Sequence, residues 1–186
     1  MTNDFEKVQL KRPSFFDRLL VGKKELVGAE IGVWKGEHAW AMLNQLDIKK
    51  LYLIDPYQAY EGYTGLGLQS PQEILMSEMF AKKLLKDEGH EDQIEWIAKF
   101  SKDAVKDVKE DLDFVYIDGN HEYKYVFDDI SRWSKKVKTG GLVGGHDYNI
   151  VRGKAYADGV IRAINTYCDE NKIKFEVSGE EWYYWK

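Results

Sequence analysis

The sequence predicts an α/β fold in three layers, in which helices cover both faces of a mostly parallel β-sheet. Two observations support this prediction. Short apolar runs typical of buried strands alternate along the chain with segments of helical periodicity. The chain then ends in two strand-like runs, over 173–177 and 181–185, whose connector is short enough for a hairpin. We therefore expect an antiparallel strand from the C-terminus beside the parallel ones.

Length and composition indicate a single globular domain. The chain has 186 residues, enough to bury a substantial core, and we expect one domain over 1–186 in which 1–22 form a leading arm and helix. The net charge of −5 argues against a nucleic-acid-binding face. A single cysteine, the lack of a secretory signal and the lack of an apolar run of bilayer-spanning length predict a cytoplasmic protein without membrane contacts.

The first half of the chain contains a clear helix start. Ser70 fits an N-cap, Pro71 takes the first helical position, and Glu73 completes a capping box three residues after the cap. After Gly36, apolar residues recur at helical spacing. The elements expected in this half are a helix over 13–21, a strand over 26–32, a helix from about 37, a strand over 51–54, a helix over 71–86 and a strand over 94–98.

The second half contains one strongly amphipathic pattern. Val126, Ile130, Trp133 and Val137 fall at i, i+4, i+7 and i+11, which predicts a helix that buries one stripe. The other elements expected before the two C-terminal strands are a short helix around 104–108, a strand over 112–117, a strand of small residues over 140–145 and a helix over 160–167.

The turn after the first expected strand is the most informative segment. The strand delivers Glu30, and a turn bounded by Gly32 and Gly36 leads into a helix, which is the layout of a nucleotide-type pocket. A pyrophosphate loop needs glycine where Trp34 stands. The indole and the carboxylate disfavour pyrophosphate and suit a ligand with a cationic end and no phosphate, such as S-adenosylmethionine.

Acidic residues gather at the expected carboxyl ends of the strands, where ligands bind in an open α/β sheet. Asp55 ends the second strand and could accept both hydroxyls of a ribose; a turn cap before Pro56 is the alternative. Asp118 and Asp147 end two successive strands and would repel each other without a cation between them. Mg²⁺, another divalent metal or the methionine ammonium would serve, and two loop-capping aspartates are the alternative.

Histidines add to this edge of the sheet. His121 follows Asp118 by three residues and can take a proton near neutral pH; a solvent-facing helix residue is the alternative. His146 suits a softer metal, a supporting role or a substrate contact. We expect His38 on a helix surface and His90 in a loop.

Two motifs resemble a known family. The segments FVYIDGNHEY over 114–123 and GGLVGGHDY over 140–148 resemble class I S-adenosylmethionine-dependent methyltransferases, in particular the small branch with macrocin O-methyltransferase and cephalosporin-hydroxylase-type proteins. The resemblance runs from about 27 to 148. It implies a three-layer Rossmann-like methyltransferase fold with a mostly parallel sheet and an antiparallel C-terminal strand.

The resemblance also implies roles for particular residues. A base falls at His121, where relatives carry lysine, and Asp118 lies near the sulfonium. His146 stands where metal-dependent relatives carry a carboxylate, so the donor set departs from theirs. The implied cofactor-binding residues are Glu30, Gly32, Val33, Trp34 and Gly36 at the methionine end, Asp55 at the ribose, Ser101 with Lys102 at the adenine, and Asp118; the implied metal ligands are Asp118, His146 and Asp147.

The expected function is methyl transfer from S-adenosylmethionine to a small-molecule acceptor, at a hydroxyl oxygen and with assistance from a metal. Alternatives are the same transfer without metal, a binding protein that keeps the cofactor but not the chemistry, and a nicotinamide-dependent oxidoreductase. The Tyr- and Gly-rich loop over 56–69 suits a mobile lid, with a surface Ω-loop as the alternative. No nucleic-acid or membrane partner is expected, and a homodimer would cover the aromatic terminal segments.

Overall fold

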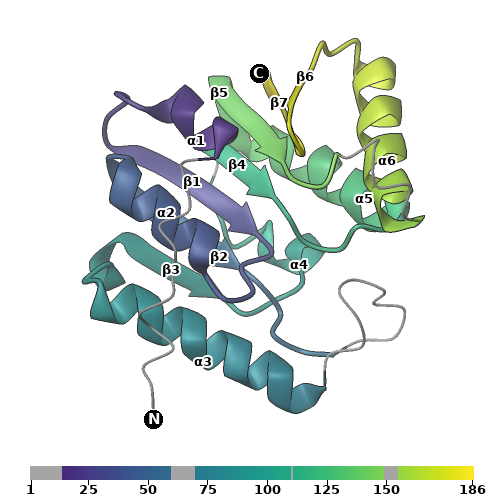
Figure 1. Ribbon diagram of the computed structural model, residues 1–186. Coiled ribbons are helices and arrows are strands. Elements are labelled where there is room, and N and C mark those ends of the chain that lie inside the picture. Colours follow the sequence, from purple (N-terminus) through teal and green to yellow (C-terminus); the bar gives the residue numbers. More distant parts are fainter. Residues whose placement is uncertain (1–13, 60–69, 110, 149–154) are drawn as a thin grey trace.

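The computed structural model describes residues 14–59, 70–109, 111–148 and 155–186 and contains one seven-stranded sheet. The strand order is β3-β2-β1-β4-β5-β7-β6, and β7 is antiparallel to both of its neighbours (Figure 1). The predicted mostly parallel sheet with an antiparallel C-terminal strand is therefore confirmed. The strands are β1 (Leu26–Ile31), β2 (Ile48–Ile54), β3 (Ile94–Ile97), β4 (Leu112–Ile117), β5 (Val137–Gly145), β6 (Glu176–Ser178) and β7 (Glu181–Trp185).

Helices cover both faces of this sheet, as the three-layer prediction requires (Figure 1). One buried cluster joins α1, α2 and α3 to the sheet, and a second joins α4, α5 and α6 to the opposite face. Among the described helices, none is both long and apolar enough to cross a bilayer. The helices are α1 (Phe15–Leu20), α2 (Glu37–Gln45), α3 (Pro71–Asp87), α4 (Ser101–Ala104), α5 (Tyr123–Trp133) and α6 (Ala155–Asn171), with 3₁₀ turns η2 (Glu91–Gln93) and η3 (Ser134–Lys136).

Alternation along β4 shows why both faces are apolar. Phe114 and Tyr116 pack with α1 and α2, whereas Val115 and Ile117 pack with the helices of the other face. All four side chains are at least 96 % buried, because successive strand residues point to opposite faces of a sheet covered on both sides.

The predicted start of α3 is confirmed in detail. The Ser70 hydroxyl accepts the N–H of Glu73 at 3.2 Å, and the Glu73 carboxylate accepts the N–H of Ser70 at 2.7 Å. Two of the otherwise unpaired N–H groups at the helix start are satisfied in this way.

The prediction that Val137 continues the helical stripe is wrong. Helix α5 ends at Trp133, one 3₁₀ turn follows, and Val137 begins β5 opposite Leu112 of β4. Val137 is buried because it lies in the sheet beside β4. The spacing of apolar residues shows only that a residue is buried, and it cannot tell a strand position from the buried face of a helix. Other boundaries differ by two to four residues: α4 ends at Ala104 although Val108 is buried, β2 begins at Ile48, and β6 begins at Glu176.

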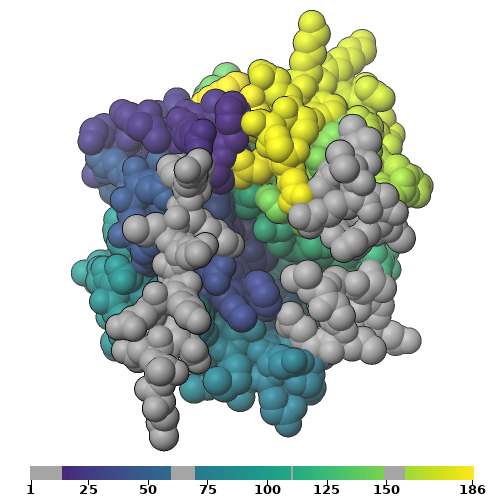
Figure 2. Space-filling view, viewed as in Figure 1, coloured from purple at the N-terminus to yellow at the C-terminus, as the bar shows by residue number. Residues whose placement is uncertain are grey.

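The N-terminal helix and the C-terminal strand lie against each other. Figure 2 shows the purple α1 segment beside the yellow C-terminal residues on the molecular surface. The rings of Phe15 and Tyr183 are 5.4 Å apart between centroids, and Phe16 and Leu20 are fully buried beneath α1. Helix α1 therefore packs against β4 and β7 on one face of the sheet.

Candidate functional site

A cavity of about 620 Å³ opens at the carboxyl ends of β1, β2, β4 and β5. This is the switch point of the sheet, where the chain leaves β1 in one direction and β4 in the other. Among the residues predicted from the sequence, those that line it are Glu30, Gly32, Val33, Trp34, Asp55, Ser101, Lys102, Asp118, His121, His146 and Asp147.

Gly36 does not line this cavity, and its role is one of packing. It is the N-cap of α2 with φ of 72°, and a Cβ added there would lie 3.1 Å from the Cβ of Ala81 on α3. The lid predicted over 56–69 falls largely outside the described residues, because 60–69 are not described.

Gly32 allows the β1 and β4 loops to cross closely. Its φ is +88°, and a Cβ added there would lie only 2.2 Å from the carbonyl oxygen of Asp118. Only glycine combines this left-handed backbone with so short an approach. The crossing brings Glu30 and Asp118, which end neighbouring strands, to the same wall of the cavity.

Asp55 braces the turn that follows β1. Its Oδ2 accepts the N–H groups of Val33 and Trp34, both at 3.0 Å, and its Oδ1 accepts the N–H of Tyr57 at 2.9 Å. Burial raises the pKa of Asp55, and these three backbone donors oppose that rise. The turn-capping role weighed from the sequence is thus present, on a carboxylate that also lines the cavity.

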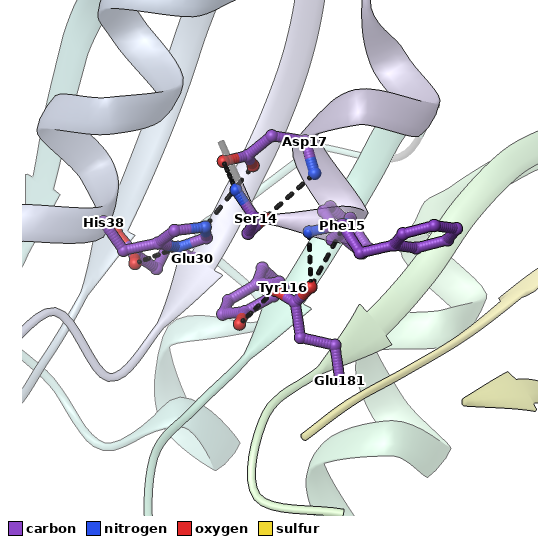
Figure 3. Close-up of polar contacts among 8 residues, drawn as sticks. Ser14, Phe15, Asp17, Glu30, His38, Tyr116 and Glu181 are labelled. Atoms are coloured by element: carbon purple, nitrogen blue, oxygen red, sulfur yellow. Dashed lines mark hydrogen bonds and ion pairs between the residues drawn. The ribbon is translucent and has the colours of Figure 1, made fainter. Parts of the chain in front are cut away.

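His38 does not lie on a helix surface, and that prediction is wrong. Its ring is largely buried between two carboxylates: Nδ1 lies 2.9 Å from Oε1 of Glu30, and Nε2 lies 3.4 Å from Oδ1 of Asp17 (Figure 3). Burial alone would lower the pKa of His38, but the hydrogen bonds and charges of both carboxylates outweigh it and raise the pKa to about 10. His38 is therefore an imidazolium at neutral pH. The sequence does not indicate this contact, because Asp17 lies on another helix, α1.

Glu30 is almost completely buried, with 1 % of its surface exposed. Burial raises the pKa of Glu30, and the contact with His38 opposes that rise. His90, by contrast, lies at a loop position as predicted, where Nδ1 is 2.9 Å from Oε1 of Gln93.

The histidines and acids after β4 and β5 form one continuous cluster around Asp147. Nε2 of His121 lies 2.9 Å from Oδ2 of Asp147 and 3.6 Å from Oδ1 of Asp118. His146 lies 3.5 Å from Asp147 through Nδ1 and 3.7 Å from Oε2 of Glu180 through Nε2. Glu180 lies in the β6–β7 turn, and no motif in the sequence marks it.

The ligand atoms of this cluster divide into two groups that could hold a metal ion. One consists of Asp118, His121 and Asp147, and the other of His146, Asp147 and Glu180. The predicted ligands Asp118 and His146 each share a group with Asp147 but not with each other, and each group adds a residue outside the predicted set. Carboxylate oxygens suit Mg²⁺, whereas the two imidazoles suit a softer ion such as Mn²⁺, Fe²⁺ or Zn²⁺.

Electrostatics decides what His121 can do. Burial alone would lower the pKa of His121, but hydrogen bonds and charges from Asp118 and Asp147 raise the pKa to about 9. The same contacts hold the pKa of Asp147 well below its ordinary range, against the effect of burial. An imidazolium cannot accept a proton. A base role for His121 therefore requires a cation that neutralises these carboxylates.

Ser101 begins α4 and donates its hydroxyl hydrogen bond to the carboxylate of Asp129 on α5. Asp129 lines the cavity and is 5 % exposed, and burial raises its pKa to about 7. Asp129 escaped prediction, because it stands in the middle of the amphipathic α5 pattern.

A sheet of this order, with a cavity lined by carboxylates at the switch point, defines a Rossmann-like methyltransferase fold. A family model described as a methyltransferase domain matches residues 29–148. The chain belongs to this family, and the class I methyltransferase resemblance of the motifs is confirmed.

Individual relatives are distant. The chain is 27 % identical over 168 residues to uncharacterized protein R132 of Acanthamoeba polyphaga mimivirus, covering 84 % of this chain and 68 % of that one. The O-methyltransferase NovP superposes with a TM-score of 0.65 at 17 % identity, covering 86 % of this chain and 71 % of NovP.

Two further solved structures share the fold. An O-methyltransferase from Bacillus cereus, solved in complex with SAH, has a TM-score of 0.65 at 14 % identity. The match covers 91 % of this chain and 77 % of the Bacillus cereus chain. An rRNA methylase from Streptococcus thermophilus has a TM-score of 0.60 at 14 % identity, and the match covers 93 % of this chain and 94 % of the methylase.

Proposed function

We propose that this protein transfers a methyl group from S-adenosylmethionine to a hydroxyl oxygen of a small molecule. The observation that carries the proposal is the convergence of Glu30, Asp55 and Asp118 on one cavity, in a chain of a methyltransferase family. These carboxylates stand at the ends of β1, β2 and β4, side by side along the edge of the sheet.

The cavity offers groups suited to each part of the cofactor. Neighbouring strands are about 4.8 Å apart, so the five parallel strand ends from β3 to β5 span roughly 19 Å. An extended nucleoside with an amino-acid arm fits along this edge. Ser101 and Lys102 would border the base at the β3 end, and Asp55 would accept ribose hydroxyls. Its Oδ1 takes one backbone N–H and retains room for another donor.

Around the reacting end, Glu30 and Asp118 place negative charge on the wall of the cavity, which favours a cationic sulfonium. Bound S-adenosylmethionine would supply an electrophilic methyl group: a C–O bond to the substrate forms as the C–S bond breaks, leaving S-adenosylhomocysteine. The hydroxyl proton must leave as well. His121 could accept it once a cation occupies the carboxylates, and that cation would also acidify the hydroxyl.

An oxygen of a small molecule is favoured over RNA by charge. Proteins that bind RNA usually neutralise phosphates with a basic face, and this chain has a net charge of −5. NovP and the Bacillus cereus enzyme are both named O-methyltransferases, which supports oxygen as the accepting atom.

The test is a methyl-transfer assay with labelled S-adenosylmethionine and a panel of phenols, catechols and sugar hydroxyls. Each reaction is run with Mg²⁺, with Mn²⁺ and with EDTA. We expect transfer to at least one class of hydroxyl, reduced by EDTA and by Asp147→Asn but not by Asp87→Asn, an exposed carboxylate on α3. Transfer that is unaffected by EDTA would exclude a role for a metal in the reaction. Transfer to RNA alone would overturn the acceptor class.

A further inference from the structure

We propose that Asp17 and His38 are positioning residues for the cofactor, which hold Glu30 so that its free oxygen binds the ammonium of the cofactor's amino-acid end. The inference rests on the proposed function and extends it to α1, a segment that precedes the family match at 29–148.

The Glu30 carboxylate has one oxygen that is engaged and one that is free. Oε1 of Glu30 lies 2.9 Å from Nδ1 of His38, but Oε2 is buried and has no hydrogen-bond partner in the described part of the chain. A buried carboxylate oxygen without a donor costs free energy. Since Glu30 lines the cavity, a cationic donor bound there would complete its coordination. An ammonium group is such a donor.

The second step is the way in which His38 is fixed. It stands in the first turn of α2, lines the cavity, and its ring lies 4.1 Å from the Tyr116 ring between centroids. Its Nε2 faces Oδ1 of Asp17, and neither atom has another partner among the described residues. The two carboxylates thus hold the ring from opposite sides, as Figure 3 shows.

The third step is the charge. Asp17 and Glu30 together carry two negative charges and the His38 imidazolium one positive charge, so the trio carries one net negative charge. One ammonium group neutralises it. Without Asp17, His38 would lose one of the two partners that keep it charged, and Glu30 would lose the stable orientation of its Oε1.

The fourth step is the anchoring of α1, which brings Asp17 into place. The Glu181 carboxylate of β7 accepts the N–H groups of Phe15 at 2.6 Å and of Phe16 at 3.2 Å. The same carboxylate accepts the Tyr116 hydroxyl at 3.1 Å (Figure 3). Tyr116 therefore contacts both His38, which lines the cavity, and the Glu181 carboxylate that anchors α1. Helix α1 lies behind the wall of the cavity and reaches it through His38.

The experiment compares two ligands by calorimetry. S-adenosylhomocysteine has the amino-acid end, and 5′-methylthioadenosine has the same nucleoside and sulfur without it. We expect Asp17→Asn and His38→Gln each to weaken S-adenosylhomocysteine about 10-fold or more, the scale of one charge-assisted hydrogen bond. Methylthioadenosine should change less than about 3-fold. Asp87→Asn, on the exposed face of α3, should change neither Kd.

The outcomes separate cleanly. If the variants weaken both ligands equally, or weaken neither, the positioning role is overturned while the proposed function stands. If the wild-type chain binds neither ligand, the proposed function fails first. Should Asp17→Asn unfold, His38→Gln alone decides, since it leaves the capping contacts of α1 with Ser14 intact.

Discussion

Nε2 of His121 lies 2.9 Å from Oδ2 of Asp147, and this contact joins the loop after β4 to the end of β5. The pair places the candidate base beside the carboxylate that belongs to both candidate metal groups. In the proposed mechanism, proton transfer and metal binding would therefore depend on the same atoms.

The first prediction concerns this pair. Asp147→Asn removes the closest negative charge from His121, so the pKa of His121 should fall from about 9 toward its ordinary value of 6.5. Histidine ring protons followed by NMR against pH in the presence of EDTA give the measurement, with His121→Gln assigning the signal. An unchanged pKa would show that Asp147 does not control the charge of His121.

The second prediction concerns the crossing at Gly32. Gly32→Ala must displace the Asp118 carbonyl and adopt φ of +88°, so we expect a loss of about 2–4 kcal/mol in the free energy of unfolding and of cofactor binding. Gly22→Ala is the matched control. Gly22 has φ of +85° but open space around its Cβ, and we expect a loss of only about 1 kcal/mol. Equal losses in urea unfolding would contradict the close crossing.

The third prediction concerns pH and His38. Its pKa is about 10 when folded and 6.5 when unfolded, so its contribution to stability is full below pH 6.5 and lost as pH rises through 10. Wild type should therefore lose on the order of 3 kcal/mol relative to His38→Gln between pH 6.5 and 10. The groups that face the His38 ring in the wild-type protein are Asp17, Glu30 and the Tyr116 ring. Parallel stability curves for the two proteins would contradict the charged ring.

The fourth prediction concerns Asp129. Its pKa is about 7 when folded against 3.8 when unfolded, so the neutral form is favoured and stability falls as pH rises from about 4 through 7. Asp129→Asn keeps an oxygen for the Ser101 hydroxyl and removes this dependence. Relative to wild type, the variant should gain about 1–3 kcal/mol between pH 5 and pH 8 in urea unfolding. No relative gain would show that burial does not favour the neutral form of Asp129.

The sequence predicts those features that depend on local pattern. Glu30 stands near the end of an apolar strand, and Asp55 and Asp118 directly follow two others. Parallel strands bring their carboxyl ends to one edge, so the convergence of these carboxylates could be expected. The capping box of Ser70 is local as well.

Features that depend on distant contacts could not be predicted. His38 is next to Asp17 only because α1 folds back over the sheet, and Glu180 reaches His146 only through the β6–β7 turn. Helical spacing places Val137 on the α5 stripe, because its actual strand partner, Leu112, lies far earlier in the chain.

Calorimetric titration of the protein with S-adenosylhomocysteine tests most directly whether the cavity binds the methyl donor. We expect one molecule bound per chain with micromolar affinity, weakened at least about 10-fold by Asp55→Asn, which loses the charge that accepts ribose hydroxyls and braces the turn. Asp87→Asn should bind as wild type does. Absence of binding to the folded wild-type protein would contradict the assignment of the cavity as a methyl-donor site.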